Sequence, residues 1–236
     1  MKKLLLVVVA LVAATAAAAA VVARGEGSAL PLAPLSSLGK ITPAPSAGKA
    51  GPEGVPVPKT TKLVDNGKVL EVKLNETVDG ITCQQVEKLA YHIHVHLTIF
   101  VDGKAIAIPY GIGIGPPLEG IPASEGGPFI TLGSCFMWLH THALDGIIHI
   151  ESPTKKIYTL SQFFAVWGQT LSKTQVGPDK GKVTTFYDGK VWTGDPGAIP
   201  LTSETQIQLD VGTPIVAPEH IKFPPGLAPS GPLASK

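Results

Sequence analysis

The feature that most constrains the fold is a strict two-residue alternation between positions 91 and 101. Every second residue of YHIHVHLTIFV is apolar, and the residues between them include His92, His94 and His96. Because successive side chains of an extended strand point to opposite faces, one face of this strand is apolar and the other carries the three imidazoles. The segment therefore predicts a β-strand that packs against a core on one side.

Similar short segments recur between about residues 61 and 216. Three Asp-Gly pairs, at 102–103, 145–146 and 188–189, accept the positive φ angles of two-residue hairpin turns. Gly and Pro number 26 and 22, and 16% of the residues are charged, which argues against a helical bundle. We therefore predict an all-β domain, mainly antiparallel, that forms a sandwich or a small barrel. The expected strands are 68–74, 91–101, 104–109, 129–135, 138–144, 147–151, 183–187, 190–193 and 205–211.

One short helix is expected after residue 159. Thr159 and Gln162 fit a capping box, in which each side chain accepts from the other's backbone N–H, and Gly168 is a typical helix stop. The segment between them carries two phenylalanines and a tryptophan. Large apolar side chains at helical spacing usually fill a core, so this helix is expected to pack on the sheet.

The ends of the chain predict export and a semi-extended, Pro-rich attachment. Lys2 and Lys3 precede an unbroken apolar run, so residues 1–23 are expected to be a signal peptide or a retained membrane anchor, with 4–23 as the tether. The protein is then periplasmic, at the cell surface or extracellular. Residues 24–60 predict a Pro/Gly/Ala-rich linker and 217–236 a Pro-rich tail, on either side of a His-rich β-domain at 61–216.

Charge and cysteine content narrow the function classes. The formal net charge is +1 and no basic stripe is present, so no nucleic-acid partner is expected. An even number of cysteines in an exported protein favours a disulfide between Cys83 and Cys135. The alternatives are that Cys135, five residues before His140, is a thiolate metal ligand, or that both thiols are free.

Six of the seven histidines lie in the central part of the sequence. If residues 145–146 form a two-residue turn, His142 opposes His149 and His140 opposes Glu151, all on one face of a hairpin. Three imidazoles and a carboxylate then converge. A one-residue slip in this register would place them on opposite faces.

Imidazole nitrogens with one carboxylate oxygen suit a transition-metal ion such as Zn(II), Cu(II), Ni(II), Mn(II) or Fe(II) rather than Ca(II) or Mg(II). Only two methionines occur, which argues against a Cu(I) carrier, so Cu(II) or Zn(II) is expected. The candidate ligands are His140, His142, His149, Glu151, His92, His94 and His96. The last three either complete the same site, form a second site or orient the first ligands.

Three segments resemble a group of exported, largely uncharacterised bacterial and archaeal proteins that combine an H-x-H-x-H strand with an LHTH…GIIHIE hairpin. They are HIHVHLTIFVDGKAIAIPYGIGI, LHTHALDGIIHIESPTKKIYTLSQFFAVWG and YDGKVWTGDP. The resemblance covers about half of the domain and implies a shared exported β-domain. The group has Asp after the second His of LHTH, where this chain has Ala143.

Three functions fit these observations. The first is a metal-binding carrier, buffer or sensor for Cu(II) or Zn(II) with a saturated ligand set. The second is a metal-dependent enzyme with an open position on a three-His and Glu site, in which Glu151 or Asp145 is the general base. The third is a structural β-domain whose histidines merely titrate.

Overall fold

The computed structural model describes residues 29–58, 62–124 and 126–234. The expected leader at 1–23 lies outside these residues. Residues Pro31–Lys236 form one compact unit, to which the following description applies. Within the described residues, every helix is too short or too polar to span a membrane.

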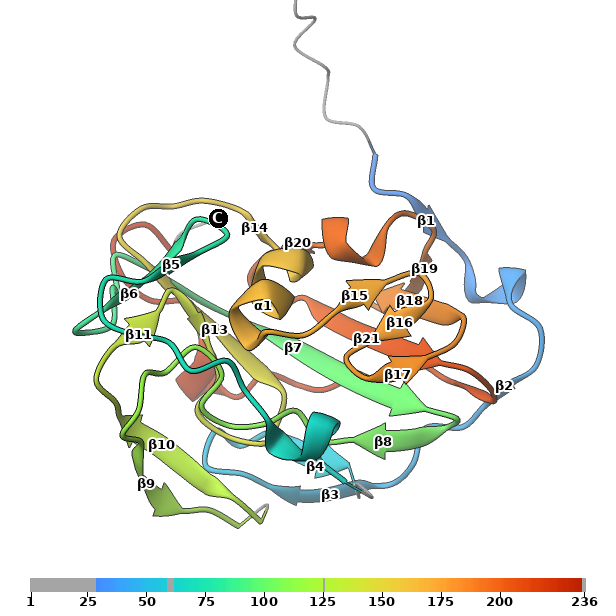
Figure 1. Cartoon of the computed structure of the whole chain (residues 1–236). Coiled ribbons are helices and arrows are strands. Elements are labelled where there is room, and N and C mark those ends of the chain that lie inside the picture. Colours follow the sequence, from blue (N-terminus) through green and yellow to red (C-terminus); the bar gives the residue numbers. More distant parts are fainter. Residues whose placement is uncertain (1–28, 59–61, 125, 235–236) are drawn as a thin grey trace, which may run out of the picture. The chain divides into compact units, whose positions relative to one another are not determined.

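An eight-stranded sheet lies at the centre of this unit (Figure 1). Its long strand β7 (Tyr91–Val101) pairs antiparallel with β13 (Ile147–Ser152) and β8 (Lys104–Ile106), and parallel with β21 (Gln206–Val211). The order across the sheet is β1 (Leu32–Ala33), β19 (Lys190–Trp192), β18 (Val183–Tyr187), β21, β7, β13 and β12 (Leu139–His140). In the described part of the chain, strands make up 39% of the structure and there is a single short α-helix, which confirms the predicted all-β fold.

Short strands and 3-10 turns surround this sheet. Of the pairings between described strands, only β21 with β7 and β2 with β22 are parallel, so the predicted antiparallel character is confirmed. The remaining elements are β2 (Ile41–Thr42), β3 (Ala47–Ala50), β4 (Pro56–Pro58), β5 (Thr77–Val78), β6 (Ile81–Gln84), β9 (Glu119–Pro122), β10 (Pro128–Leu132), β11 (Phe136–Met137), β14 (Tyr158–Thr159), β15 (Leu171–Ser172), β16 (Gln175–Val176), β17 (Asp179–Lys180), β20 (Pro200–Leu201), β22 (Ile215–Val216), η1 (Leu35–Ser37), η2 (Val64–Gly67), η3 (Pro196–Ala198) and η4 (Pro225–Leu227).

The predicted helix is confirmed as α1 (Leu160–Trp167). Gln162 Oε1 accepts from the Thr159 backbone N–H at 3.1 Å, and Gly168 ends the helix at φ 76°. The aromatic side chains of α1 are buried in one cluster with the apolar face of the sheet, which includes Ile93 and Ile150. The opposite face of β7, β13 and β12 is the one that carries the histidines.

Two of the three expected Asp-Gly turns are confirmed. Val101 pairs with Lys104 across residues 102–103, and Tyr187 with Lys190 across 188–189. The tight turn expected at 145–146 is wrong. Gly146 instead packs against β7, and a Cβ atom on residue 146 would lie 2.3 Å from the Leu97 carbonyl oxygen.

The hairpin register is consequently corrected by two residues. His140 pairs with His149, instead of with Glu151. Beyond His140 the backbone leaves β13, because Thr141 N donates to Ile112 O at 3.1 Å and His142 O accepts from Ile130 N at 2.9 Å. A shift of two residues keeps every side chain on its predicted face. The predicted strand at 138–144 is accordingly reduced to β12.

The strand expected at 68–74 is also absent from the structure. The alternation there is real, since Val72 is buried between exposed neighbours. However, the segment lies beside α1 rather than beside a strand, with Leu70 N donating to Trp167 O at 3.1 Å. Without a neighbouring strand, an alternating sequence stays an extended segment.

Cys83 and Cys135 form a disulfide. The bond links β6 to the residue before β11, and both half-cystines are completely buried. The prediction of a disulfide is thus confirmed, and the alternative role of Cys135 as a thiolate ligand does not apply.

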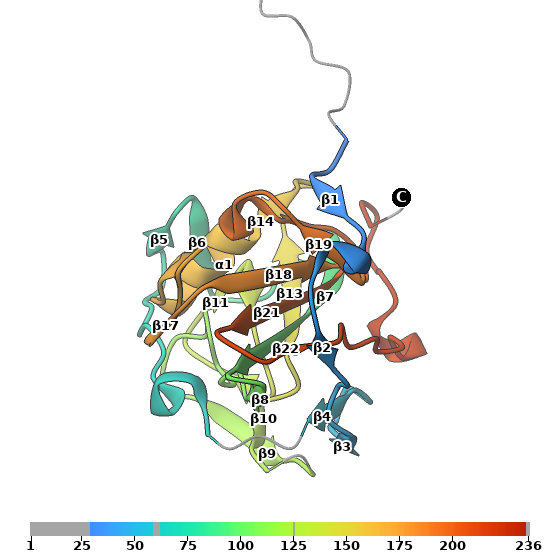
Figure 2. The same ribbon diagram turned by 90° about the vertical axis from the view of Figure 1, so that its right-hand side faces the viewer.

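The segments expected to be a linker and a tail contact the folded domain at several of their described residues. β1 pairs with β19, and β2 pairs with β22. Figure 2 shows α1 on one side of the sheet and β2, β3 and β4, with the C-terminal segment, on the other. Glu53 of the predicted linker and Leu227 and Ser230 of the predicted tail lie against the histidines of the sheet, so both segments contribute contacts to the folded domain.

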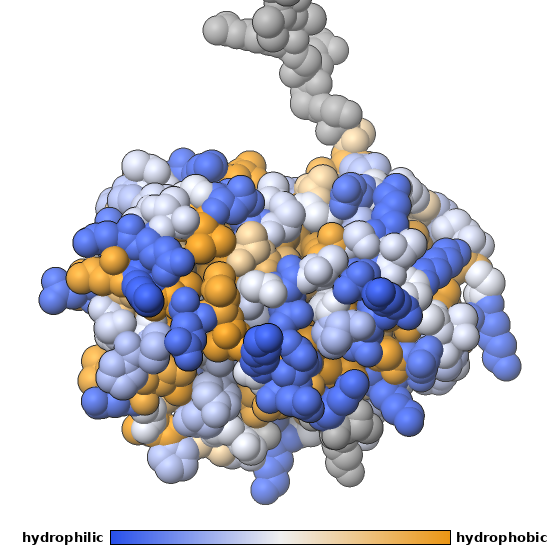
Figure 3. All heavy atoms as spheres, in the orientation of Figure 1, coloured by the Kyte–Doolittle hydropathy of each residue, from blue (hydrophilic) through white to orange (hydrophobic). Residues whose placement is uncertain are grey.

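The surface over α1 mixes residue types. Polar and apolar residues are interspersed over the face seen in Figure 3. Exposed large apolar side chains include Val86, Leu89 and Ile157. Such scattered exposure is ordinary for a water-exposed protein surface.

Candidate metal centre

Three neighbouring strands bring a row of histidines together. His94 of β7 pairs with His149 of β13, and His149 pairs with His140 of β12. Paired residues of adjacent strands share a face, so the three imidazoles stand side by side. Glu151, two residues beyond His149, opposes His92 in the same way.

The first group of potential ligands consists of His92, His94 and His149. The Nε2 atoms of His92 and His94 are 3.1 Å apart, and His94 Nε2 lies 3.1 Å from His149 Nδ1. The second group consists of His140, His142 and His149, in which the Nε2 atoms of His140 and His142 are also 3.1 Å apart. His149 belongs to both groups.

These separations are those of nitrogen atoms bound to one metal ion. With metal–nitrogen bonds of ~2.0–2.1 Å, two ligands at angles between square and tetrahedral lie roughly 2.9–3.4 Å apart. The structure therefore brings the imidazoles to ligand spacing.

The outward nitrogens of three histidines are held by backbone carbonyl groups. His94 Nδ1–H donates to Leu227 O at 3.1 Å, His140 Nδ1–H to Met137 O at 2.9 Å, and His142 Nδ1–H to Ile130 O. A neutral imidazole that donates through Nδ1 carries a lone pair on Nε2. The lone pairs of His140 and His142 thus face each other, an arrangement that a cation between them would stabilise.

His149 is oriented by a carboxylate instead. Its Nε2 lies 2.8 Å from Glu53 Oε1 and its Nδ1 faces the cluster. A carboxylate that accepts from a histidine fixes the ring orientation and raises the basicity of the other nitrogen, as in many metal sites. Glu53 comes from the segment interpreted as a linker, and nothing in its local sequence indicated this role.

Glu151 contacts both groups with different oxygen atoms. Its Oε1 lies 3.0 Å from His92 Nε2 and 3.5 Å from His149 Nδ1, and its Oε2 lies 3.9 Å from His140 Nε2. Oε2 is buried and has no hydrogen-bond partner among the residues that the structure describes. A buried oxygen without a partner is costly, and a bound cation would remove that cost.

The cluster is bordered by two further side chains, which the sequence did not indicate. Glu87 Oε1 lies 3.6 Å from His142 Nε2, and Glu87 forms a third potential ligand group with His140 and Glu151. Ser230 Oγ lies 2.6 Å from His92 Nδ1. Both come from irregular segments, so no periodicity marked them.

His96 lies outside all three ligand groups found in the described residues. It is buried on the same face of β7, but its Nε2–H donates to Asp145 O at 3.0 Å. The Asp145 carbonyl thus occupies one of the two ring nitrogens of His96. The structure does not bring His96 to the other six predicted ligands.

Burial keeps most of these imidazoles neutral. It lowers the pKa of His94 and of His142 to about 2, with the neighbouring His149 adding to the effect, and the pKa of His140 to about 4. Burial alone would also lower the pKa of His149, but the Glu53 and Glu151 carboxylates raise it to about 10. Without metal, the cluster therefore carries its proton on His149.

One end of the cluster is open to solvent. A pocket of about 420 Å³ adjoins His92, His94, His149 and Glu151 and is bordered by the segments around Glu53 and Leu227. The His92 side chain is 18% exposed, whereas the His140 side chain is fully buried. An ion or a small molecule can therefore reach the cluster from the His92 end.

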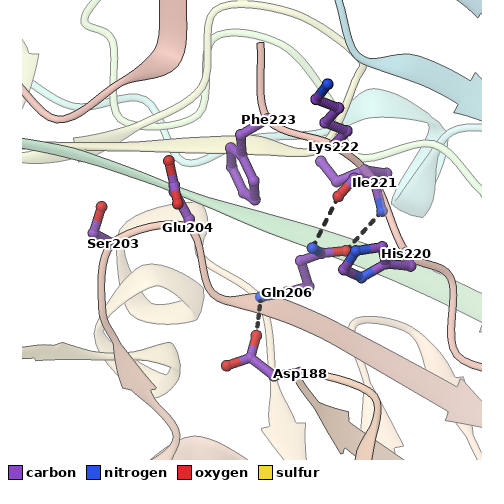
Figure 4. Close-up of a pocket in the computed structure, with 8 residues that line it drawn as sticks. All are labelled: Asp188, Ser203, Glu204, Gln206, His220, Ile221, Lys222 and Phe223. Atoms are coloured by element: carbon purple, nitrogen blue, oxygen red, sulfur yellow. Dashed lines mark hydrogen bonds between the residues drawn. The ribbon is translucent and has the colours of Figure 1, made fainter. Parts of the chain in front are cut away.

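A second pocket, of about 470 Å³, surrounds His220 (Figure 4). Its polar side chains hold the backbone in place: Asp188 Oδ1 accepts from Gln206 N at 2.8 Å, and the Gln206 amide bonds to both the N–H and the carbonyl of Ile221. These hydrogen bonds anchor the C-terminal segment. Among the described residues, no side chain that lines this pocket belongs to a potential ligand group.

The candidate centre therefore combines histidines from β7, β12, the loop after β12 and β13 with carboxylates from three parts of the chain. Comparisons with protein-family models, with curated proteins and with solved structures found no match to this chain.

Proposed function

We propose that this protein is an exported transition-metal-binding protein, a carrier, buffer or sensor that holds Cu(II) or Zn(II) in its histidine cluster. The observation that carries the proposal is the pair His140 and His142. Their Nδ1 protons are committed to backbone carbonyls, and their Nε2 atoms face each other at 3.1 Å. This is a preorganised site for a cation.

The ligand chemistry supports a borderline transition-metal ion. Five imidazoles and Glu151 supply nitrogen with a minority of oxygen, whereas Ca(II) and Mg(II) prefer oxygen ligands. The cysteines are joined in a disulfide, so no thiolate selects Cu(I). Cu(II) and Zn(II) are the ions that best match imidazole-rich sites.

Two features support an exported location. Residues 1–23 carry the expected pattern of an export signal or anchor. The disulfide between Cys83 and Cys135 is typical of oxidising compartments. An exported site of this kind would meet Cu(II) or Zn(II) outside the cytosol.

A second candidate function is a metal-dependent enzyme. The observation that favours it is the 420 Å³ pocket beside His92 and Glu151, because catalytic metal sites keep a coordination position for water or substrate. Azide added to the Cu(II) form separates the two functions. A new absorption band would indicate an open position and favour the enzyme, and an unchanged spectrum would favour the carrier.

Metal titration of the secreted protein tests the proposal. The metal-free protein is titrated with Cu(II) and with Zn(II) against a competing chelator. The variant His140→Ala/His149→Ala removes ligands from both groups, and His96→Ala/His220→Ala is a matched control that removes two imidazoles outside them. We expect the first variant to lose at least ~100-fold in affinity and the control to keep native affinity.

The proposal is wrong if the native protein takes up neither ion. It is also wrong if the first variant, with its fold verified by circular dichroism, binds as tightly as the native protein. A loss confined to the control would move the site to His96 or His220.

A further inference from the structure

We infer that the cluster holds two metal ions, bridged by the carboxylate of Glu151. The inference rests on the proposed metal-binding function and concerns the number of ions and the way they are joined. It starts from an excess of donors. Five imidazole nitrogens and three carboxylate oxygens border the cluster, while a Zn(II) ion in a protein usually takes four ligands and at most about five.

The donors divide into two sets around the two oxygens of Glu151. The first set consists of His92 Nε2, His94 Nε2, His149 Nδ1 and Glu151 Oε1. Neighbouring atoms in this set are separated by 3.0 to 3.5 Å. Two atoms bound to one ion at ~2.0–2.1 Å are at most about 4.2 Å apart, so each of these neighbouring pairs is close enough to share an ion.

The second set consists of His140 Nε2, His142 Nε2, Glu87 Oε1 and Glu151 Oε2. The two nitrogens are 3.1 Å apart, Glu87 Oε1 lies 3.6 Å from His142 Nε2, and Glu151 Oε2 lies 3.9 Å from His140 Nε2. These separations are also within the span of one coordination sphere. The unpartnered, buried Oε2 is the atom that the second ion would satisfy.

His149 presents one nitrogen to the cluster, although it belongs to two of the ligand groups. Its Nε2 is occupied by Glu53, so one nitrogen, Nδ1, faces the cluster. That nitrogen lies 3.1 Å from His94 Nε2 and 3.5 Å from Glu151 Oε1, which assigns it to the first set. Glu87 then completes the second set, because it forms a potential ligand group with His140 and Glu151.

Counting bound Cu(II) tests the inference. Metal-free native protein is titrated with Cu(II), separated from free ion and analysed for copper, and its electron paramagnetic resonance is recorded. We expect two ions per chain. Because bridged ions in two-metal sites lie ~3.5–4 Å apart, the signal of the isolated ion should fall as the second equivalent binds.

Variants assign the bridge. Glu87→Gln is expected to bind one ion with an uncoupled signal, and Glu151→Gln is expected to lose the coupling. Glu219→Gln is the matched control, because Glu219 is a half-buried glutamate bonded to Thr98 outside the cluster. It should bind two coupled ions.

The possible outcomes are distinct. One ion per native chain, or two ions without coupling, overturns the inference and leaves the proposed function standing. No bound ion overturns both. Unchanged coupling in Glu151→Gln would remove the bridge from Glu151 and overturn the inference as stated.

Discussion

The two ends of the histidine cluster are built in different ways. At the closed end, His140 and His142 are held by the carbonyls of Met137 and Ile130, within a few residues along the chain or across one loop. At the open end, His92 and His94 contact Ser230 and Leu227 of the C-terminal segment. The closed end is oriented by the core of the domain, and the open end by a segment laid over it.

Because the two ends differ in exposure, we expect bound ions to exchange at different rates at each end. The closed end has no exposed imidazole surface at His140, whereas His92 is partly exposed beside a pocket. Ions at the closed end should therefore leave slowly. Ions at the open end should exchange with solvent and respond to changes in the covering segments.

Replacing either pair of ligands should change metal affinity and release more than any other substitution. Replacing His140 and His142 by Ala should remove the slowly released ion and lower the tightest affinity at least ~100-fold. Replacing His92 and His94 by Ala should remove the rapidly exchanging ion and leave slow release in place. Release into excess chelator, followed by stopped-flow absorbance of Cu(II), distinguishes these results. Equal release kinetics in the two variants would abolish the distinction between the ends.

The next effect concerns Glu53, which orients the histidine shared by both ligand groups. Glu53→Gln should lower metal affinity ~10–100-fold, because partners of metal-bound histidines typically contribute that much. Chelator competition measures the change, with Glu219→Gln as the control. A native affinity in Glu53→Gln would mean that the 2.8 Å contact between Glu53 and His149 does not help to hold the ion.

The pH dependence of metal affinity should reflect the proton on His149. Its pKa is raised to about 10, so near neutral pH the incoming ion displaces one proton, and affinity should rise ~10-fold per pH unit below pH 10. Below about pH 4, protonation of His140 should steepen the loss. Calorimetry at pH 7 in buffers of different ionisation enthalpy measures the released proton. Proton release should fall in Glu53→Gln, and no release in the native protein would contradict the account.

The smallest effect is expected at the covering segment. Ser230→Ala removes one hydrogen-bonding group from His92, and a single hydrogen bond is worth ~0.5–1.5 kcal/mol, or about 2–10-fold in affinity. The loss should be confined to the rapidly exchanging ion. A change in the slowly released ion would show that the two ends are coupled more strongly than this comparison assumes.

Much of the site follows from local sequence patterns. The alternation from Tyr91 to Val101 predicted the histidine face of β7. The Asp-Gly pairs at residues 102–103 and 188–189 predicted the two hairpin turns. The faces of His140 and His149 were also predicted correctly. Each of these features depends on side-chain period and turn chemistry, which a short stretch of sequence contains.

The remainder depends on contacts between distant segments. The register of the hairpin differs by two residues because residues 141–146 bond to other segments and to β7 instead of closing tightly. His96 is diverted by the carbonyl of Asp145. Glu53 and Glu87 lie in stretches without periodicity, so only the folded chain brings them to the histidines.

The proposed function puts transition-metal ions among the imidazoles of β7, β12, the loop after β12 and β13. Anomalous diffraction from crystals of the Cu(II)-treated or Zn(II)-treated protein, recorded on both sides of the metal absorption edge, tests it most directly. We expect a peak ~2.0–2.1 Å from His140 Nε2 and His142 Nε2, and a second peak between His92 and His149. Peaks confined to His96 or His220, or an empty cluster under saturating metal, would contradict it.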